Sequence, residues 1–264
     1  AMRVHAALGH IEGLAKATYL RGAAEMNRGR TAQAQALLER ARSQAASAGN
    51  VPVQRGAILN LVKIHTQTGA VAAALQALQE GEALSPYFES RVAEAAFVQA
   101  RYYCHALVGE LDAARALLPR VIATGDACAE PYWQVGARHL VADMLLLVGD
   151  FQQAGHLLHE ALALCAGAAD EHHLALVQAK LAWMELLRGD PAAALARLQA
   201  LGALETTEPP EARDVRRHVE ASARLALGDA AGALALLPAP GQSSTEESKA
   251  LQWAVRLQAE AALG

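Results

Sequence analysis

Residues 149–161, GDFQQAGHLLHEA, decide the fold of this chain. The glycine at the start of this stretch can end a helix in the left-handed conformation, because it has no Cβ to clash, and Asp150 can cap the helix that follows. Ala154 falls early in that second helix, where only a small side chain lets two antiparallel helices approach closely. Leu157 and Leu158 then form its apolar face. The stretch therefore predicts a helical hairpin that turns at Gly149.

The same pattern recurs along the chain with a nearly constant period. Turn glycines follow one another at intervals of 40, 40, 40, 40, 39 and 36 residues, at Gly29, Gly69, Gly109, Gly149, Gly189, Gly228 and Gly264. Each of the first six is followed five residues later by an alanine, namely Ala34, Ala74, Ala114, Ala154, Ala194 and Ala233. A fixed period of this length indicates an array of stacked helix pairs.

The period sets the expected elements. First helices are predicted at about 12–28, 53–68, 88–108, 131–148, 171–188 and 211–227, each followed by a turn and a second helix. A terminal helix is predicted at 245–263, so that residues 1–264 form a single array of about six helix pairs. Because the terminal helix stops where another turn and second helix would begin, we expect the chain to be a fragment of a longer protein. Pro119 and Pro238 are expected to kink or shorten their second helices.

Composition supports helices and excludes several functional classes. The chain is 53% hydrophobic but only 4% aromatic, with most of the apolar share in Ala and Leu, which favour helix. The net charge of -4, without a basic stripe, argues against nucleic-acid binding. The three cysteines, Cys104, Cys128 and Cys165, have no metal-ligand spacing, and the longest apolar runs are too short to cross a membrane. We therefore expect a reduced, cytoplasmic protein without membrane contact.

The turn and the second helix resemble the second half of a tetratricopeptide (TPR) repeat. The hallmark of that half is a glycine, an alanine five residues on and another alanine twelve residues on, here Gly149, Ala154 and Ala161. Other repeats depart from it at the twelfth position, for example at Gly81. The resemblance implies an all-α solenoid, a right-handed superhelix of antiparallel helix pairs that binds a protein or peptide partner along a concave groove.

The length of the period suggests a subfamily. A standard TPR repeat has about 34 residues, so a period of 40 means longer helices. Such periods resemble the repeat region of the maltose-regulon activator and related ATPase-linked bacterial transcription regulators, although no phosphate-binding glycine loop is present. This resemblance implies a signal-sensing region of a larger regulator that binds a small-molecule inducer or a protein and contacts neighbouring domains. The alternative is a standalone scaffold that binds a partner peptide or helix without a ligand switch.

In arrays of this family the first helices line the concave groove. We therefore expect two repeat-equivalent positions of these helices to face the groove. These lie six and ten residues before each turn glycine, and the predicted binding residues occupy them: Tyr19, Lys63, Gln99, Tyr103, His139, Asp143, Trp183 and His218. A structural position would be uniformly small or apolar, whereas these positions mix polar and aromatic side chains, as a recognition surface requires. We expect Tyr103, His139, Asp143 and Trp183 to form its centre. Alternatively, Tyr103 and Trp183 fill gaps between neighbouring first helices.

Catalytic and metal sites find no support in the sequence. His156 and His159 lie three residues apart on one predicted helix, but they lack a third ligand. Cys104 and His105 are neighbours on a helix, so they point about 100° apart and cannot act as a nucleophile and its base. We therefore predict that the protein is not an enzyme and holds no metal or cofactor.

Overall fold

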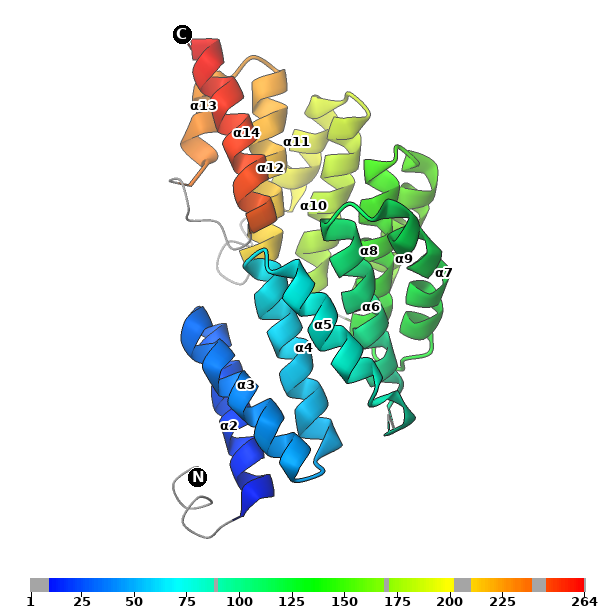
Figure 1. Cartoon of the computed structure of the whole chain (residues 1–264). Coiled ribbons are helices and arrows are strands. Elements are labelled where there is room, and N and C mark those ends of the chain that lie inside the picture. Colours follow the sequence, from blue (N-terminus) through cyan, green and yellow to red (C-terminus); the bar gives the residue numbers. More distant parts are fainter. Residues whose placement is uncertain (1–9, 88–89, 169–170, 202–209, 239–245, 264) are drawn as a thin grey trace. The chain divides into compact units, whose positions relative to one another are not determined.

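The computed structural model describes residues 10–87, 90–168, 171–201, 210–238 and 246–263, and every regular element in these ranges is helical (Figure 1). The all-α prediction is confirmed. The helices are α2 Ile11–Asn27, α3 Thr31–Ser47, α4 Val51–Gln67, α5 Val71–Glu82, the 3-10 turn η1 Ser85–Tyr87, α6 Arg91–Leu107, α7 Leu111–Asp126, α8 Pro131–Leu147, α9 Phe151–Ala168, α10 Glu171–Leu187, α11 Pro191–Ala200, α12 Pro210–Ala226, α13 Ala230–Leu236 and α14 Glu246–Leu263. Residue 245, the predicted start of the terminal helix, lies outside the described residues.

The chain divides into two compact units, Ala1–Leu117 and Leu118–Gly264, with the boundary inside α7. That residues 1–264 form one array stays a prediction.

The turn glycines have the conformation that the sequence predicts. Gly149 has φ +81°, and the Asp150 N–H donates to the Leu145 carbonyl at 2.8 Å, which satisfies the end of α8. Asp150 Oδ1 accepts a hydrogen bond from the Gln153 N–H at 3.1 Å and so caps α9. Positive φ is also found at the other described turn glycines, Gly29, Gly69, Gly109, Gly189 and Gly228. The local sequence thus fixes where each first helix ends.

The small residue five positions after each turn glycine is where the two helices of a pair meet. All six of these alanines are fully buried: Ala34, Ala74, Ala114, Ala154, Ala194 and Ala233. A larger side chain at these positions would push the helices apart. The alanine repeat is therefore a packing feature.

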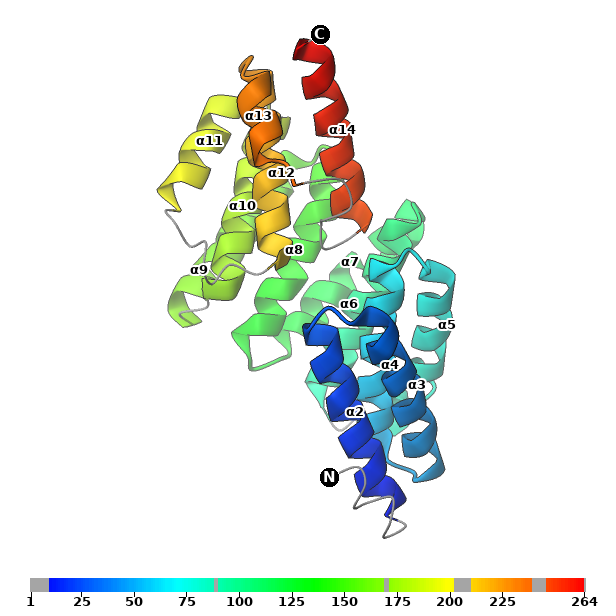
Figure 2. The ribbon, with the colours of Figure 1, turned by 90° about the vertical axis from the view of Figure 1, so that its left-hand side faces the viewer.

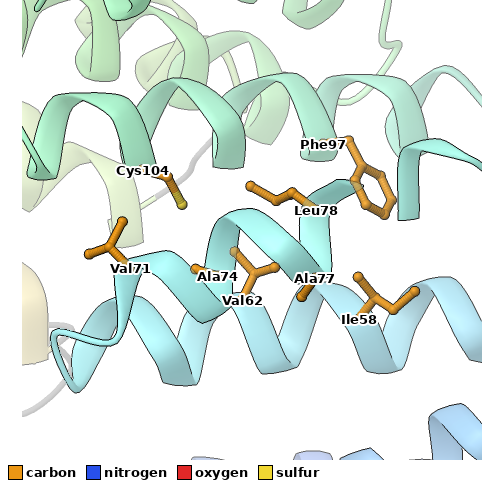
Figure 3. Close-up of a cluster of buried hydrophobic side chains, with 8 residues drawn as sticks. All are labelled: Ile58, Val62, Val71, Ala74, Ala77, Leu78, Phe97 and Cys104. Carbon is orange, nitrogen blue, oxygen red and sulfur yellow. The ribbon is translucent and has the colours of Figure 1, made fainter. Parts of the chain in front are cut away.

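One hydrophobic cluster of the first unit is built between α4, α5 and α6. Ile58 and Val62 of α4 contact Ala74, Ala77 and Leu78 of α5, and Phe97 and Cys104 of α6 cover the other side of α5 (Figure 3). A Cβ added to Gly81 would lie 2.1 Å from Phe97 Cε1. Position 81 therefore holds glycine and not alanine because the ring of the next first helix fills the space that an alanine side chain would occupy.

The two unusual prolines behave differently. Helix α13 ends at Leu236, and Leu237 is extended, so Pro238 shortens this second helix as predicted. Helix α7 continues past Pro119 to Asp126, so the shortening expected there does not occur. Pro119 lies inside α7 and is exposed.

In the second unit the first helices of the pairs form one layer and the second helices another, and neighbouring helices contact one another more in the first layer. The first helices α8, α10 and α12 contact one another in chain order, whereas no substantial contact joins α9 to α11 or α11 to α13 among the described residues. Figure 2 shows α10 and α12 side by side, with α11 off to one side. Side chains on adjacent first helices are therefore the ones that meet, and this layer carries the candidate site.

Candidate functional site

A buried ion pair joins α8 to α10 in the first-helix layer of the second unit. Lys180 Nζ donates to Asp143 Oδ2 at 2.5 Å, and the two side chains are 6% and 30% exposed. A lysine is almost never this buried unless it is paired, since removing a charge from water is costly. Asp143 pairs with this cation from the neighbouring repeat, and its own side chain is 30% exposed although Oδ1 is buried.

Three rings extend this pair along the same helix contact. Tyr132 of α8 meets His173 of α10 edge-on with ring centroids 4.7 Å apart, and His173 lies 6.0 Å from His139. His139 and Asp143 stand four residues apart on α8 and so share a face. Both histidines are buried, whereas Tyr132 is 53% exposed. The five residues Tyr132, His139, Asp143, His173 and Lys180, hereafter the α8–α10 site, run from an exposed aromatic ring to a buried ion pair.

The other two predicted residues of the second unit lie elsewhere. Trp183 packs against the cluster that contains Ala179, Ala182 and Ala194, where α10 meets α11 and α12. His218 of α12 is largely buried, and desolvation lowers its pKa to about 4. Its Nδ1 finds no hydrogen-bond partner within the described residues. A neutral imidazole at this position is therefore part of the protein interior.

The four predicted binding residues of the first unit differ in how deeply they are buried. Tyr19 packs against Ala15, Ala45 and Val53, and its hydroxyl lies 2.9 Å from where a Cβ on Gly56 would be, so the ring fills space between α2 and α4. Gln99 is buried and Tyr103 is half-buried. Lys63 is the exposed member of the set. Tyr103 belongs to this unit, whereas the other three residues of the predicted centre belong to the second.

The titratable residues considered for catalysis or metal binding have ordinary structural partners. Burial raises the pKa of the Cys104 thiol to about 11, so it is protonated at neutral pH. His105 Nδ1 lies 2.6 Å from Glu110 Oε2, and His159 Nδ1 lies 2.6 Å from the Gly155 carbonyl oxygen. No cluster of three potential metal ligands occurs in the part of the chain that the structure describes. Within the same ranges, no helix combines the length and apolarity that a membrane crossing requires.

Sequence reasoning missed Tyr132, His173 and Lys180. The available signal was Lys180, a lone lysine between Ala179 and Leu181 in the largely apolar second half of α10. It stands nine residues before its turn glycine, outside the two positions that the family resemblance singles out. A charge in a buried stretch predicts a partner on a neighbouring helix, although not which one.

Comparison with known proteins gives structural matches alone. No protein-family profile matches the chain, and a search of curated proteins finds no relative. Among solved structures, BtubC (BKLC) from P. vanneervenii is similar with a TM-score of 0.59 and 15% identity, over 82% of this chain and 87% of that one. A chain of TPR-like repeats from a kinesin light chain of Podospora anserina gives a TM-score of 0.52 and 20% identity, over 76% of this chain and 95% of that one. The fold is accordingly an α-solenoid of TPR-like helix pairs.

Proposed function

We propose that this chain is a TPR-like interaction scaffold that holds a protein or peptide partner on its first-helix layer, with the α8–α10 site as a main contact. The observation that carries the proposal is the Lys180–Asp143 pair beside three rings, whereas the neighbouring cluster of α10, α11 and α12 is made of apolar residues, most of them alanines. A purely structural contact between two helices needs no charge, and apolar residues of similar volume would hold it at least as well.

The exposure of these residues suggests how a partner would be recognised. Tyr132 offers a half-exposed ring held edge-on against His173, and tyrosines that are fixed in this way are common anchors of interfaces. The Asp143 side chain, fixed by Lys180, is 30% exposed although its Oδ1 is buried, so a partner would make contact with the edge of this side chain that remains exposed. The site thus combines an aromatic anchor with an oriented acceptor, which suits a peptide better than a nucleic acid.

Site-specific photo-crosslinking in source cells tests this proposal. A photoreactive residue is placed at Tyr132, and at Gln152 of α9 as the control, since Gln152 is exposed on a second helix. We expect a discrete protein adduct at position 132 and none at 152. The captured partner, once purified, should bind the Asp143→Ala variant at least about tenfold more weakly than the wild type. Equal labelling at the two positions, or unchanged binding by the variant, would contradict the proposal.

The 40-residue period supports a finer proposal, that the scaffold is the sensor region of a larger cytoplasmic transcription regulator and takes a small inducer. An immunoblot of source cells measures the size of the natural polypeptide. A band several times larger than 27.7 kDa supports the regulator. A band near that mass rules it out and leaves the standalone scaffold.

A further inference from the structure

The turns that follow the first helices of the second unit carry exposed apolar side chains. Leu147 and Val148 stand at the end of α8, where they are 64% and 42% exposed. Leu187, the last residue of α10, is 43% exposed, and Leu227, directly after α12, is 54% exposed. Three successive turns therefore place large apolar side chains on the surface.

These three turns lie in a row at one edge of the second unit. Tyr132 meets His173 near the starts of α8 and α10, and Asp143 meets Lys180 nearer their ends, so the two helices run parallel. The apolar contacts between α10 and α12 follow the same order. Helices in contact lie about 8–10 Å apart. Residues 147–150, 187–190 and 226–229, hereafter the turn edge, repeat at about this distance.

The fold itself does not require apolar residues at these turns. The turns at Gly29 and Gly69 have the same left-handed glycine, with φ +74° in both. The two residues before each of these glycines are polar, namely Asn27, Arg28, Gln67 and Thr68. Because the same turn forms with polar residues, the leucines of the turn edge have another cause.

Acidic residues accompany these leucines. Asp150, Asp190 and Asp229 each follow a turn glycine, and each caps the next helix through Oδ1. The equivalent residues after Gly29 and Gly69 are Arg30 and Ala70, and α3 and α5 begin without a side-chain cap. The acidic and the apolar residues are thus present together in the second unit and absent together from these two turns.

The turn edge consequently has a net negative charge. Arg188 is the basic residue among its twelve positions, against three aspartates. Asp229 Oδ2 lies 3.8 Å from Arg224 Nη1. The second carboxylate oxygen of Asp150 and that of Asp190 make no hydrogen bond within the described residues. A ligand of this edge should therefore combine apolar with basic side chains, and the charge disfavours an anionic membrane surface.

The spacing of the turns selects the conformation of the ligand. Seven residues of an α-helix make nearly two turns and rise about 10.5 Å, so every seventh side chain points the same way at about the spacing of the turns. An extended peptide repeats its side-chain direction at about 6.6 Å and 13 Å, which fits less well. We infer that the turn edge docks a basic amphipathic helix of a partner protein, with an apolar residue at every seventh position. This surface is separate from the α8–α10 site and does not depend on the proposed function.

A designed peptide tests this inference. It is a fluorescein-labelled helix of about 20 residues, built on alanine and glutamine, with leucine at every seventh position and lysine three and four positions after each leucine. The 264-residue protein is titrated into it, and binding is followed by fluorescence anisotropy. We expect saturable binding, weakened at least about tenfold by Leu187→Gln, which removes the central apolar contact. Leu20→Gln is the matched control, since Leu20 is 56% exposed on α2, and it should bind as the wild type does.

A second variant tests the charge separately from the cap. Asparagine caps a helix about as well as aspartate, so the double variant Asp150→Asn, Asp190→Asn keeps both caps and loses two charges. It should bind the peptide about tenfold more weakly than the wild type at low salt, and equally at about 1 M salt, where surface charges are screened. A peptide with glutamate in place of lysine should not bind.

Four outcomes overturn the inference, once circular dichroism has verified that the variants are folded. Absence of saturable binding to a monomeric wild type, or equal binding by Leu187→Gln and Leu20→Gln, removes the docking surface. Equal binding of the lysine and glutamate peptides removes the requirement for a basic partner. If binding is lost in Tyr132→Ala and retained in Leu187→Gln, the peptide lies in the α8–α10 site. If the peptide does not bind but neutral phosphatidylcholine vesicles sediment the wild type and not Leu187→Gln, the edge contacts a membrane.

Discussion

Asp143 is the carboxylate that compensates the buried ammonium group of Lys180, with Oδ2 2.5 Å from Nζ across the contact between α8 and α10. The two side chains of this pair differ in solvent exposure, since the lysine is 6% exposed and the aspartate is 30% exposed. Removing the aspartate leaves the buried ammonium group of Lys180 without its counter-charge. Removing the lysine leaves an aspartate whose side chain is 30% exposed, although its Oδ1 is buried.

This asymmetry predicts unequal costs for the two halves of the pair. Asp143→Ala should lower the free energy of unfolding by about 3 kcal/mol, the lower end for a broken buried pair because the aspartate side chain is 30% exposed. Lys180→Met keeps most of the volume and should cost about 1 kcal/mol. Urea unfolding measures both. Arg91→Ala, which removes an exposed pair with Glu94, should cost less than about 0.5 kcal/mol. Equal losses for Asp143→Ala and Lys180→Met would show that the lysine is solvated.

The turn at Gly149 predicts a purely conformational effect. A Cβ at this position meets no atom within 4 Å, so the cost of a side chain comes from φ +81° alone. Gly149→Val should destabilise the protein by about 1–2 kcal/mol, whereas Gly149→Asn should cost clearly less because asparagine tolerates the left-handed region. Thermal unfolding of both variants checks this order. A valine variant as stable as the asparagine variant would mean that the turn relaxes to another conformation.

Helix bounds, turn glycines and buried alanines could be predicted from the sequence because they depend on local backbone preferences repeated at a fixed period. His139 and Asp143 could be selected for the same reason, since they occupy repeat-equivalent positions, although their role in binding stays a prediction. Lys180 and His173 could not, because their contacts depend on how α10 is rotated and shifted against α8. Trp183 shares its repeat position with Asp143 but packs where α10 meets α11 and α12, a difference that only side-chain packing decides.

Gly81 and Gly167 predict opposite effects of the same substitution. Both lie near the end of a second helix, but a Cβ at Gly81 would be 2.1 Å from Phe97 Cε1, and one at Gly167 meets nothing within 4 Å. Gly81→Ala should destabilise the protein by roughly 1–3 kcal/mol through overpacking. Gly167→Ala should stabilise it by about 0.5 kcal/mol through helix propensity. Differential scanning calorimetry gives the sign of each change. A stabilising Gly81→Ala would show that Phe97 can move away at little cost.

His218 predicts a loss of stability in mildly acidic solution. Its pKa is about 4 in the folded protein, below the value of about 6.5 for an unfolded chain, so only the unfolded state takes up the proton between these values. Stability from this group is complete above pH 6.5 and is lost as the pH falls towards 4, by roughly 2 kcal/mol between pH 7 and pH 5. His218→Leu removes the titration, so urea unfolding at the two pH values should show a smaller loss for the variant. His156→Gln, at a side chain that is 74% exposed, should leave the wild-type loss unchanged. If His218→Leu loses as much stability as the wild type, the imidazole is protonated in the folded state and another group causes the acid sensitivity.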